Sequence, residues 1–184
     1  MIDMNEDLKY IFSNINDWLK FAEAKCAGLL ALNLAAIIGL LQSASMFTDD
    51  IQNGQGILIV LFSLSSLITL YSLIPKLNTL IKFYRTIPNL EAELKHRKDN
   101  NRPTINCIYF GDIACLTEAM FSTLATNKPL DEHNSLTQLL IHQIVVNAQI
   151  ALQKYRIFSL ASWTTFVGYL FGIVLIILHH FAGK

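Results

Sequence analysis

Two amides and one amine lie on one face of a predicted helix that precedes the last apolar run of the sequence. Gln143, Asn147 and Lys154 are spaced i, i+4 and i+11, which brings three side chains to one side of a helix. Amides in a row can read the polar edge of a nucleobase, and an amine can hold a phosphate. The same residues could form the wetted side of a helix beside a membrane. The spacing therefore indicates either a nucleotide-binding face or a solvated surface.

The string Tyr109-Phe110-Gly111-Asp112 is the most distinctive short motif. Gly111 permits backbone angles that other residues avoid, and Asp112 stands where we expect a short helix, about 112–125, to begin. Asp112 could therefore be a helix cap. Alternatively it could accept a ribose hydroxyl while Tyr109 or Phe110 stacks on a base.

Several cations lie at the ends of the apolar runs. Lys25 precedes the first run, and Lys154 and Arg156 precede the third. They could anchor the helices by reaching toward lipid headgroups, or they could hold an anion. Lys154 and Arg85 are the leading candidates for binding a phosphate.

We find no pattern typical of catalysis or of a metal site. Asp131, His133 and His142 match no zinc or two-metal spacing, and the sequence has neither a glycine-rich phosphate loop nor a nucleophile elbow. The three cysteines are expected to be structural thiols. We therefore predict a protein that is not an enzyme and has no metal or cofactor, and we expect no nucleic-acid partner.

Three apolar runs dominate the chain, which is 53% hydrophobic and only 15% charged. The runs are Cys26–Phe47, Ile57–Ile74 and Ile157–Leu178; none contains Asp, Glu, Lys or Arg, and each is near the length that crosses about 30 Å of hydrocarbon. Asn33 and Gln42 in the first run are expected to face other helices, because an unpartnered amide is costly in hydrocarbon. The class predicted is an all-α membrane protein with three transmembrane helices.

The basic residues are distributed unevenly around these runs. Ten of the fourteen Lys and Arg residues lie in the segment 76–156, whereas the connection 48–56 has none. Because basic residues near the ends of spans stay in the cytoplasm, we expect a cytoplasmic amino terminus and a periplasmic carboxyl terminus. The expected layout is an amphipathic lead helix at 1–24, transmembrane helices at 25–47, 57–75 and 157–178, periplasmic segments at 48–56 and 179–184, and a helical cytoplasmic region at 76–156.

Three strings in the same order resemble one family, the Pycsar transmembrane effectors. They are the entry to the first span at Glu23–Leu30, the segment Tyr109–Ala114, and Gln143 and Asn147 followed by Ala151–Arg156. The resemblance extends from about Leu8 to Leu178. Cys26 stands where the family pattern has a small residue.

The resemblance implies a role in bacterial antiviral defence. A cyclase activated by phage would make 3′,5′-cyclic CMP or cyclic UMP, and the effector would bind this messenger and disrupt the inner membrane. The ligand-binding residues that we predict are chosen from chemistry and position: Lys154, Arg85, Asn147, Gln143, Asp112, Phe110, Tyr109 and Lys25. Because three short spans enclose little volume, we also expect a homo-oligomer, with span one at its interface. A ligand-independent scaffold subunit of a membrane complex is the alternative. A small transporter or channel is a third interpretation, which the absence of charged residues inside the spans disfavours.

Overall fold

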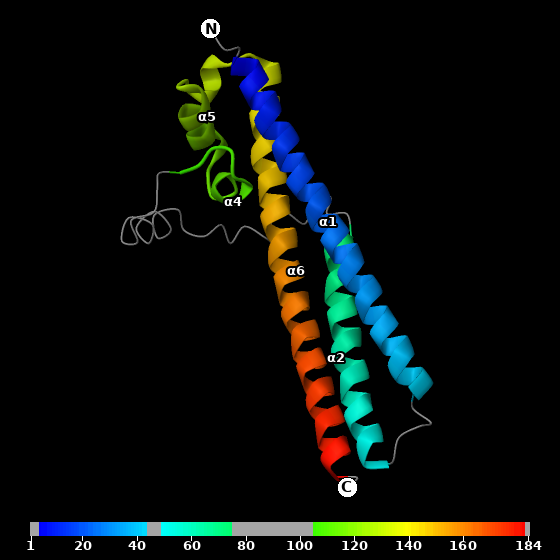
Figure 1. Ribbon diagram of the computed structural model, residues 1–184. Helices are drawn as coiled ribbons and strands as arrows, with labels where there is room; N and C mark the ends of the chain where they lie inside the picture. Colours follow the sequence, from blue (N-terminus) through cyan, green and yellow to red (C-terminus); the bar gives the residue numbers. More distant parts are fainter. Residues whose placement is uncertain (1–3, 44–48, 75–104, 183–184) are drawn as a thin grey trace, which may run out of the picture. The chain divides into compact units, whose positions relative to one another are not determined.

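The computed structural model describes residues 4–43, 49–74 and 105–182, and all of the regular structure in these ranges is helical. The elements in chain order are α1 (Met4–Ser43), α2 (Asp49–Leu73), α4 (Phe110–Ile113), α5 (Glu118–Thr126), the 3-10 helix η3 (Leu130–Glu132) and α6 (Ser135–Ala182) (Figure 1). Three of the helices, α1, α2 and α6, are long and apolar enough to cross a membrane. The predicted all-helical class with three candidate spans is therefore confirmed.

The chain forms two compact units. One unit contains residues 1–22 and 75–154, and we call it the small-helix unit because it holds α4, α5 and η3. The other contains residues 23–74 and 155–184, and we call it the span unit. The helices α1 and α6 contribute one part to each.

The core of the small-helix unit is built from the amphipathic start of α1. Leu8, Ile11, Ile15 and Ala22 are buried, at the three- and four-residue spacing of one helix face. Fully buried side chains from the other elements complete this core: Ile113, Leu116, Phe121, Ile141 and Ile144. The lead segment and the first apolar run form one unbroken helix.

The predicted helix at about 112–125 is wrong in its boundaries. Two helices, α4 and α5, occupy this stretch, and Thr117 is the cap that starts the second, because its hydroxyl accepts the Met120 N–H at 3.3 Å. The helix α5 ends at Asn127, which takes the left-handed conformation with φ of 57°.

The long last helix has a side-chain cap at its start. Asp131 lies in η3, and Asn134 Oδ1 accepts the Thr137 N–H at 2.8 Å, so α6 starts at Ser135. Asp131 and Asn134 are both acceptable N-cap residues, and the structure uses Asn134.

In the span unit, glycines let α2 and α6 approach each other closely. A Cβ added at Gly168 would lie 3.1 Å from the Phe62 ring, and one at Gly54 would lie 2.6 Å from Leu175. In contrast, Gly28 and Gly39 of α1 have no described neighbour at the corresponding position. The close approach within one chain therefore uses small residues of α2 and α6, and those of α1 face outward.

Candidate functional site

The segment 105–116 of the small-helix unit folds into a tight turn around Asp112. Asp112 is buried, and its Oδ2 accepts the Asn106 N–H at 2.9 Å. The Asn106 side chain accepts the Ile108 N–H, also at 2.9 Å. The Asp112 side chain thus stabilises the turn that leads into α4. The N-cap position of that helix is occupied by Tyr109, not by Asp112.

Aromatic side chains hold this turn against α1. The Trp18 and Phe110 ring centroids are 5.4 Å apart, and those of Tyr109 and Phe110 are 4.8 Å apart. Phe110 is only 4% exposed, whereas Tyr109 is 45% exposed. Asn14 adds a hydrogen bond from its Nδ2 to the Ile108 carbonyl at 3.1 Å. Phe110 therefore anchors the turn, and Tyr109 is the ring that remains available to stack on a ligand.

Gly111 makes room for the Tyr109 ring. A Cβ at Gly111 would lie 2.5 Å from Tyr109 Cε1, a separation that real side chains do not tolerate. The glycine has no positive φ, so its role here is space, not an unusual backbone angle.

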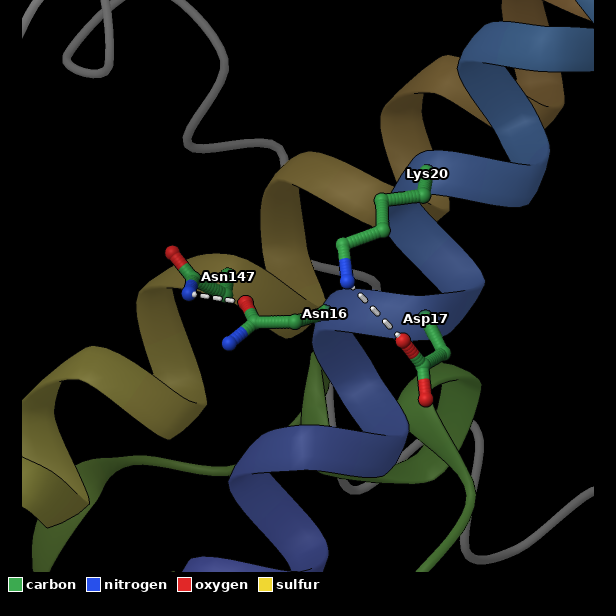
Figure 2. A network of polar contacts seen from close by, with 4 residues as sticks. All are labelled: Asn16, Asp17, Lys20 and Asn147. Atoms are coloured by element: carbon green, nitrogen blue, oxygen red, sulfur yellow. Dashed lines mark hydrogen bonds and ion pairs between the residues drawn. The ribbon is translucent and has the colours of Figure 1, made fainter.

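A pair of amides joins α1 to α6 in the same unit. Asn147 Nδ2 donates to Asn16 Oδ1 at 2.9 Å, and both side chains are half-buried (Figure 2). The Asn147 oxygen and the Asn16 nitrogen point away from this bond, and the described residues offer neither a second partner. If the oxygen and nitrogen positions were exchanged in both amides, one donor and one acceptor would still remain outside the bond. The pair therefore keeps one amide donor and one amide acceptor outside its shared hydrogen bond.

Two groups of side chains in the small-helix unit could contact a ligand, and together we call them the amide–aromatic cluster: Asn14, Trp18, Tyr109, Phe110 and Asp112 at the turn, and the Asn16–Asn147 pair. Asn16 is two residues from both Asn14 and Trp18, so the pair lies on another face of α1 than the turn. Four of the predicted residues belong to the cluster: Tyr109, Phe110, Asp112 and Asn147. Gln143 is exposed one turn before Asn147, and Lys154 is buried two turns after it on α6. Arg85 lies outside the described residues.

Lys25 belongs to the span unit. Its Nζ lies 5.4 Å from the centroid of the Tyr155 ring and 5.7 Å from that of Phe158, which is a cation–π arrangement. Such a contact suits an anchor at the end of a span.

The sequence reasoning missed three residues of the cluster, all on α1. All three, Asn14, Asn16 and Trp18, were included in the expected amphipathic lead helix at 1–24, and none was assigned to a ligand site. The available signal was the occurrence of two asparagines in the lead helix, since Asn is a poor helix former.

The Cys107 thiol lies at the edge of the turn. Burial raises its pKa, and the nearby negative charge of Asp112 raises it further. Cys107 therefore stays protonated at neutral pH, which agrees with the prediction of a structural thiol.

Two histidines make contacts that the sequence did not reveal. His142 Nδ1 lies 2.7 Å from Glu118 Oε1, joining α5 to α6, and both side chains are partly exposed. His133 is buried, and its Nε2 lies 3.0 Å from the Thr126 hydroxyl. Among the described residues no group of three or more His, Cys, Asp or Glu side chains could hold a metal ion.

The fold is that of a helical membrane protein, and the candidate polar residues lie in its small-helix unit. A family model described as the Pycsar effector protein domain matches residues 7–179, so the chain belongs to this family. Members of the family are anti-phage effectors that disrupt membranes, and the family implies a cyclic nucleotide signal from a cyclase. Curated proteins and solved structures gave no significant match.

Proposed function

We propose that this protein binds cyclic CMP or cyclic UMP at the amide–aromatic cluster and then disrupts the bacterial inner membrane, which stops growth of the infected cell. The observation that carries the proposal is the Asn16–Asn147 pair, in which the Asn147 oxygen and the Asn16 nitrogen lie outside the shared hydrogen bond. The pyrimidine edge has the complementary pattern: cytosine offers its N4 amino group next to N3, and uracil its N3–H next to O4. Two amides can therefore read one pyrimidine.

Other residues of the small-helix unit supply the remaining contacts to the nucleotide. The exposed face of Tyr109 can stack on the base, in the way that aromatic side chains bind single nucleotides. Lys154 lies seven residues beyond Asn147, which is about 10 Å along α6, and its ammonium provides the positive charge for a cyclic phosphate. Gln143 is placed to extend the base-reading face. Asp112 is a candidate for the ribose because its carboxylate can accept a hydroxyl proton.

Residues outside the cluster have other parts in the proposal. Arg85 remains a second candidate for the phosphate, on the basis of its charge. Lys25 is assigned to the boundary of the membrane because it lies over two aromatic rings.

The uneven charge of the sequence supports a cytoplasmic location for the small-helix unit, where a cyclase product would be released. The outward-facing small residues of α1, Gly28 and Gly39, support assembly of several copies through this helix in the bilayer.

The first experiment is a binding titration with the full-length protein in lipid nanodiscs. Cyclic CMP and cyclic UMP should bind, and cyclic AMP, cyclic GMP and 5′-CMP should bind more weakly. Lys154→Ala should weaken binding by about ten- to a hundred-fold, because a charge-assisted contact worth about 1.5–3 kcal/mol is lost. Asn147→Ala should weaken it about five- to ten-fold, the value of one neutral hydrogen bond of about 1 kcal/mol.

Lys128→Ala is the matched control, since Lys128 is an exposed lysine of the same unit. It should bind the nucleotide as tightly as the parent. If Lys154→Ala and Asn147→Ala also bind like the parent, the ligand site is elsewhere. If no cyclic nucleotide binds, the scaffold alternative takes the place of the proposal.

A further inference from the structure

Polar side chains join α1 to α2 at three levels within the span unit. Three pairs are in contact across the two helices: Cys26 with Ser72 at 3.6 Å, Asn33 with Ser65 at 2.9 Å, and Ser43 with Gln55 at 3.4 Å. We call these six residues the polar seam. All except Ser43, which is partly buried, are shielded from the surroundings of the chain.

The pairs are in one antiparallel register. Seven residues separate Cys26 from Asn33 and Ser72 from Ser65, and ten separate Asn33 from Ser43 and Ser65 from Gln55. Equal spacing on both helices means that a polar residue of α1 opposes a polar residue of α2 at each of these three levels. The seam covers 17 residue steps of α1, or about 25 Å, which is most of the thickness of the hydrocarbon core.

The third span closes the middle of the seam. Thr165 of α6 donates to Asn33 Oδ1 at 2.9 Å and lies 2.8 Å from the Ser65 hydroxyl, which also donates to the Ala161 carbonyl at 2.8 Å. Asn33 and Ser65 are completely buried, and Thr165 is 4% exposed. Each of these polar groups is therefore satisfied while the three helices are together.

The seam differs from the rest of the span unit in chemistry. The side chains that face outward are large and apolar, and examples from the three helices are Leu32, Leu67 and Ile173. No Asp, Glu, Lys or Arg occurs in the described residues 26–43, 54–74 or 157–182. The seam is thus an uncharged polar contact inside the bundle, whereas exposed polar side chains such as Gln42 lie outside it.

Separation of α1 from both α2 and α6 would take the Asn33 amide away from Ser65 and Thr165, the Gln55 amide away from Ser43, and the Cys26 thiol away from Ser72. In hydrocarbon such a state is strongly disfavoured, whereas in contact with water the same groups are readily hydrated. A separated seam is therefore stable only if water occupies the space between the helices. We infer that the polar seam forms the wall of the water-filled path by which small ions cross the membrane when the protein is active. The inference rests on the proposed membrane activity and names the residues that carry it.

Because the wall carries hydroxyl and amide groups but no charge, we expect little selectivity between cations and anions. A charge placed on this wall should create a preference for the opposite sign. Both expectations can be tested after the protein has folded, by chemical modification of a cysteine in the seam.

The experiment uses the full-length protein in vesicles loaded with potassium chloride. In a variant whose three native cysteines are replaced by serine, Ser65→Cys introduces a thiol in the middle of the seam, and Leu64→Cys introduces the matched control on the outward face. A second probe that leaves the seam unaltered is native Cys26 in the variant Cys107→Ser/Cys115→Ser. Cyclic CMP or cyclic UMP is added, nucleotide binding is measured in parallel, and the thiols are treated with small charged methanethiosulfonates.

We expect potassium and chloride to leak, and the seam thiols to react at least ten-fold faster than the Leu64→Cys thiol in the leaking vesicles. The anionic reagent on Ser65→Cys should raise the potassium-to-chloride flux ratio several-fold, and the cationic reagent should lower it. Vesicles that leak while both seam thiols remain as unreactive as the control would overturn the path and leave the seam as a contact between helices only.

Vesicles that bind nucleotide without leaking would overturn the path while the proposed binding site stands. A leak with reactive seam thiols in the absence of any nucleotide binding would support the path and contradict the binding site. Protein that neither binds nor leaks would contradict both.

Discussion

Asparagine side chains join helices in both units, but their hydrogen-bonding capacity is used differently. In the span unit, Asn33 is completely buried and bonded to Ser65 and Thr165. In the small-helix unit, Asn16 and Asn147 are half-buried, share one hydrogen bond, and keep a donor and an acceptor open. We call Asn33 a closed amide, because its hydrogen bonds are made within the bundle; such an amide holds helices together in lipid, where a polar group without a partner is costly. We call Asn16 and Asn147 an open amide pair, because one donor and one acceptor remain for water or a ligand.

The aromatic anchor gives the largest expected effect, and it tests whether the small-helix unit depends on aromatic packing more than on its amides. Trp18→Ala should reduce the free energy of unfolding of this unit by about 2–4 kcal/mol, somewhat less than a fully buried Trp would cost, because Trp18 is only half-buried. The measurement is thermal unfolding together with hydrogen exchange of the amides in 105–116.

Phe21→Ala is the control for this prediction. Phe21 is 50% exposed and touches Trp18 only edge-on, so its loss should cost below about 1 kcal/mol. Equal losses from the two substitutions would show that the turn is not anchored by Trp18.

The closed amide of the span unit gives the next largest effect. Asn33→Leu should destabilise the span unit by about 1–2 kcal/mol, because two buried interhelical hydrogen bonds are lost and each is worth about 0.6 kcal/mol or more in lipid. Reversible unfolding in mixed micelles measures the change. Leu34→Ala, which alters a residue that is 47% exposed toward the lipid, should change the stability by about 0.5 kcal/mol or less. If the Asn33→Leu protein were more stable than the parent, the hydrogen bonds of Asn33 would not be stabilising the packing of the three helices.

The open amide pair should contribute least to stability. A double-mutant cycle with Asn16→Ala and Asn147→Ala should give a coupling energy of about 0.5–1 kcal/mol in the absence of nucleotide. The exposed Asp17–Lys20 pair, which is drawn beside it in Figure 2, provides the reference, with an expected coupling of about 0.2–0.5 kcal/mol. A coupling energy above about 2 kcal/mol for the asparagines would show that they hold the helices together as Asn33 does, and the two units would then not differ in this respect.

The sequence by itself determined the class of the protein. The length of the three apolar runs and the lack of charge in them require helices that can cross a membrane, and both features can be read along one dimension. Asn33 was expected to face other helices, and it does so. Gln42, for which we made the same prediction, is exposed within the single chain, so the prediction stays one about other copies. Gln42 lies near the end of α1, where an amide is less costly than at the middle of a span.

Only the tertiary structure decided which polar residues meet. Asn16 and Asn147 are 131 positions apart, and no periodicity within α1 or α6 selects one partner for the other. Asp112 was equally acceptable as a helix cap or a ligand contact, and packing of the turn against Trp18 assigned it to the Asn106 N–H. The polar seam depends on the register of α1 against α2, which is set by three-helix packing and not by either helix alone. Local patterns fix the type and length of a helix, whereas its partners depend on contacts between residues that are distant in the chain.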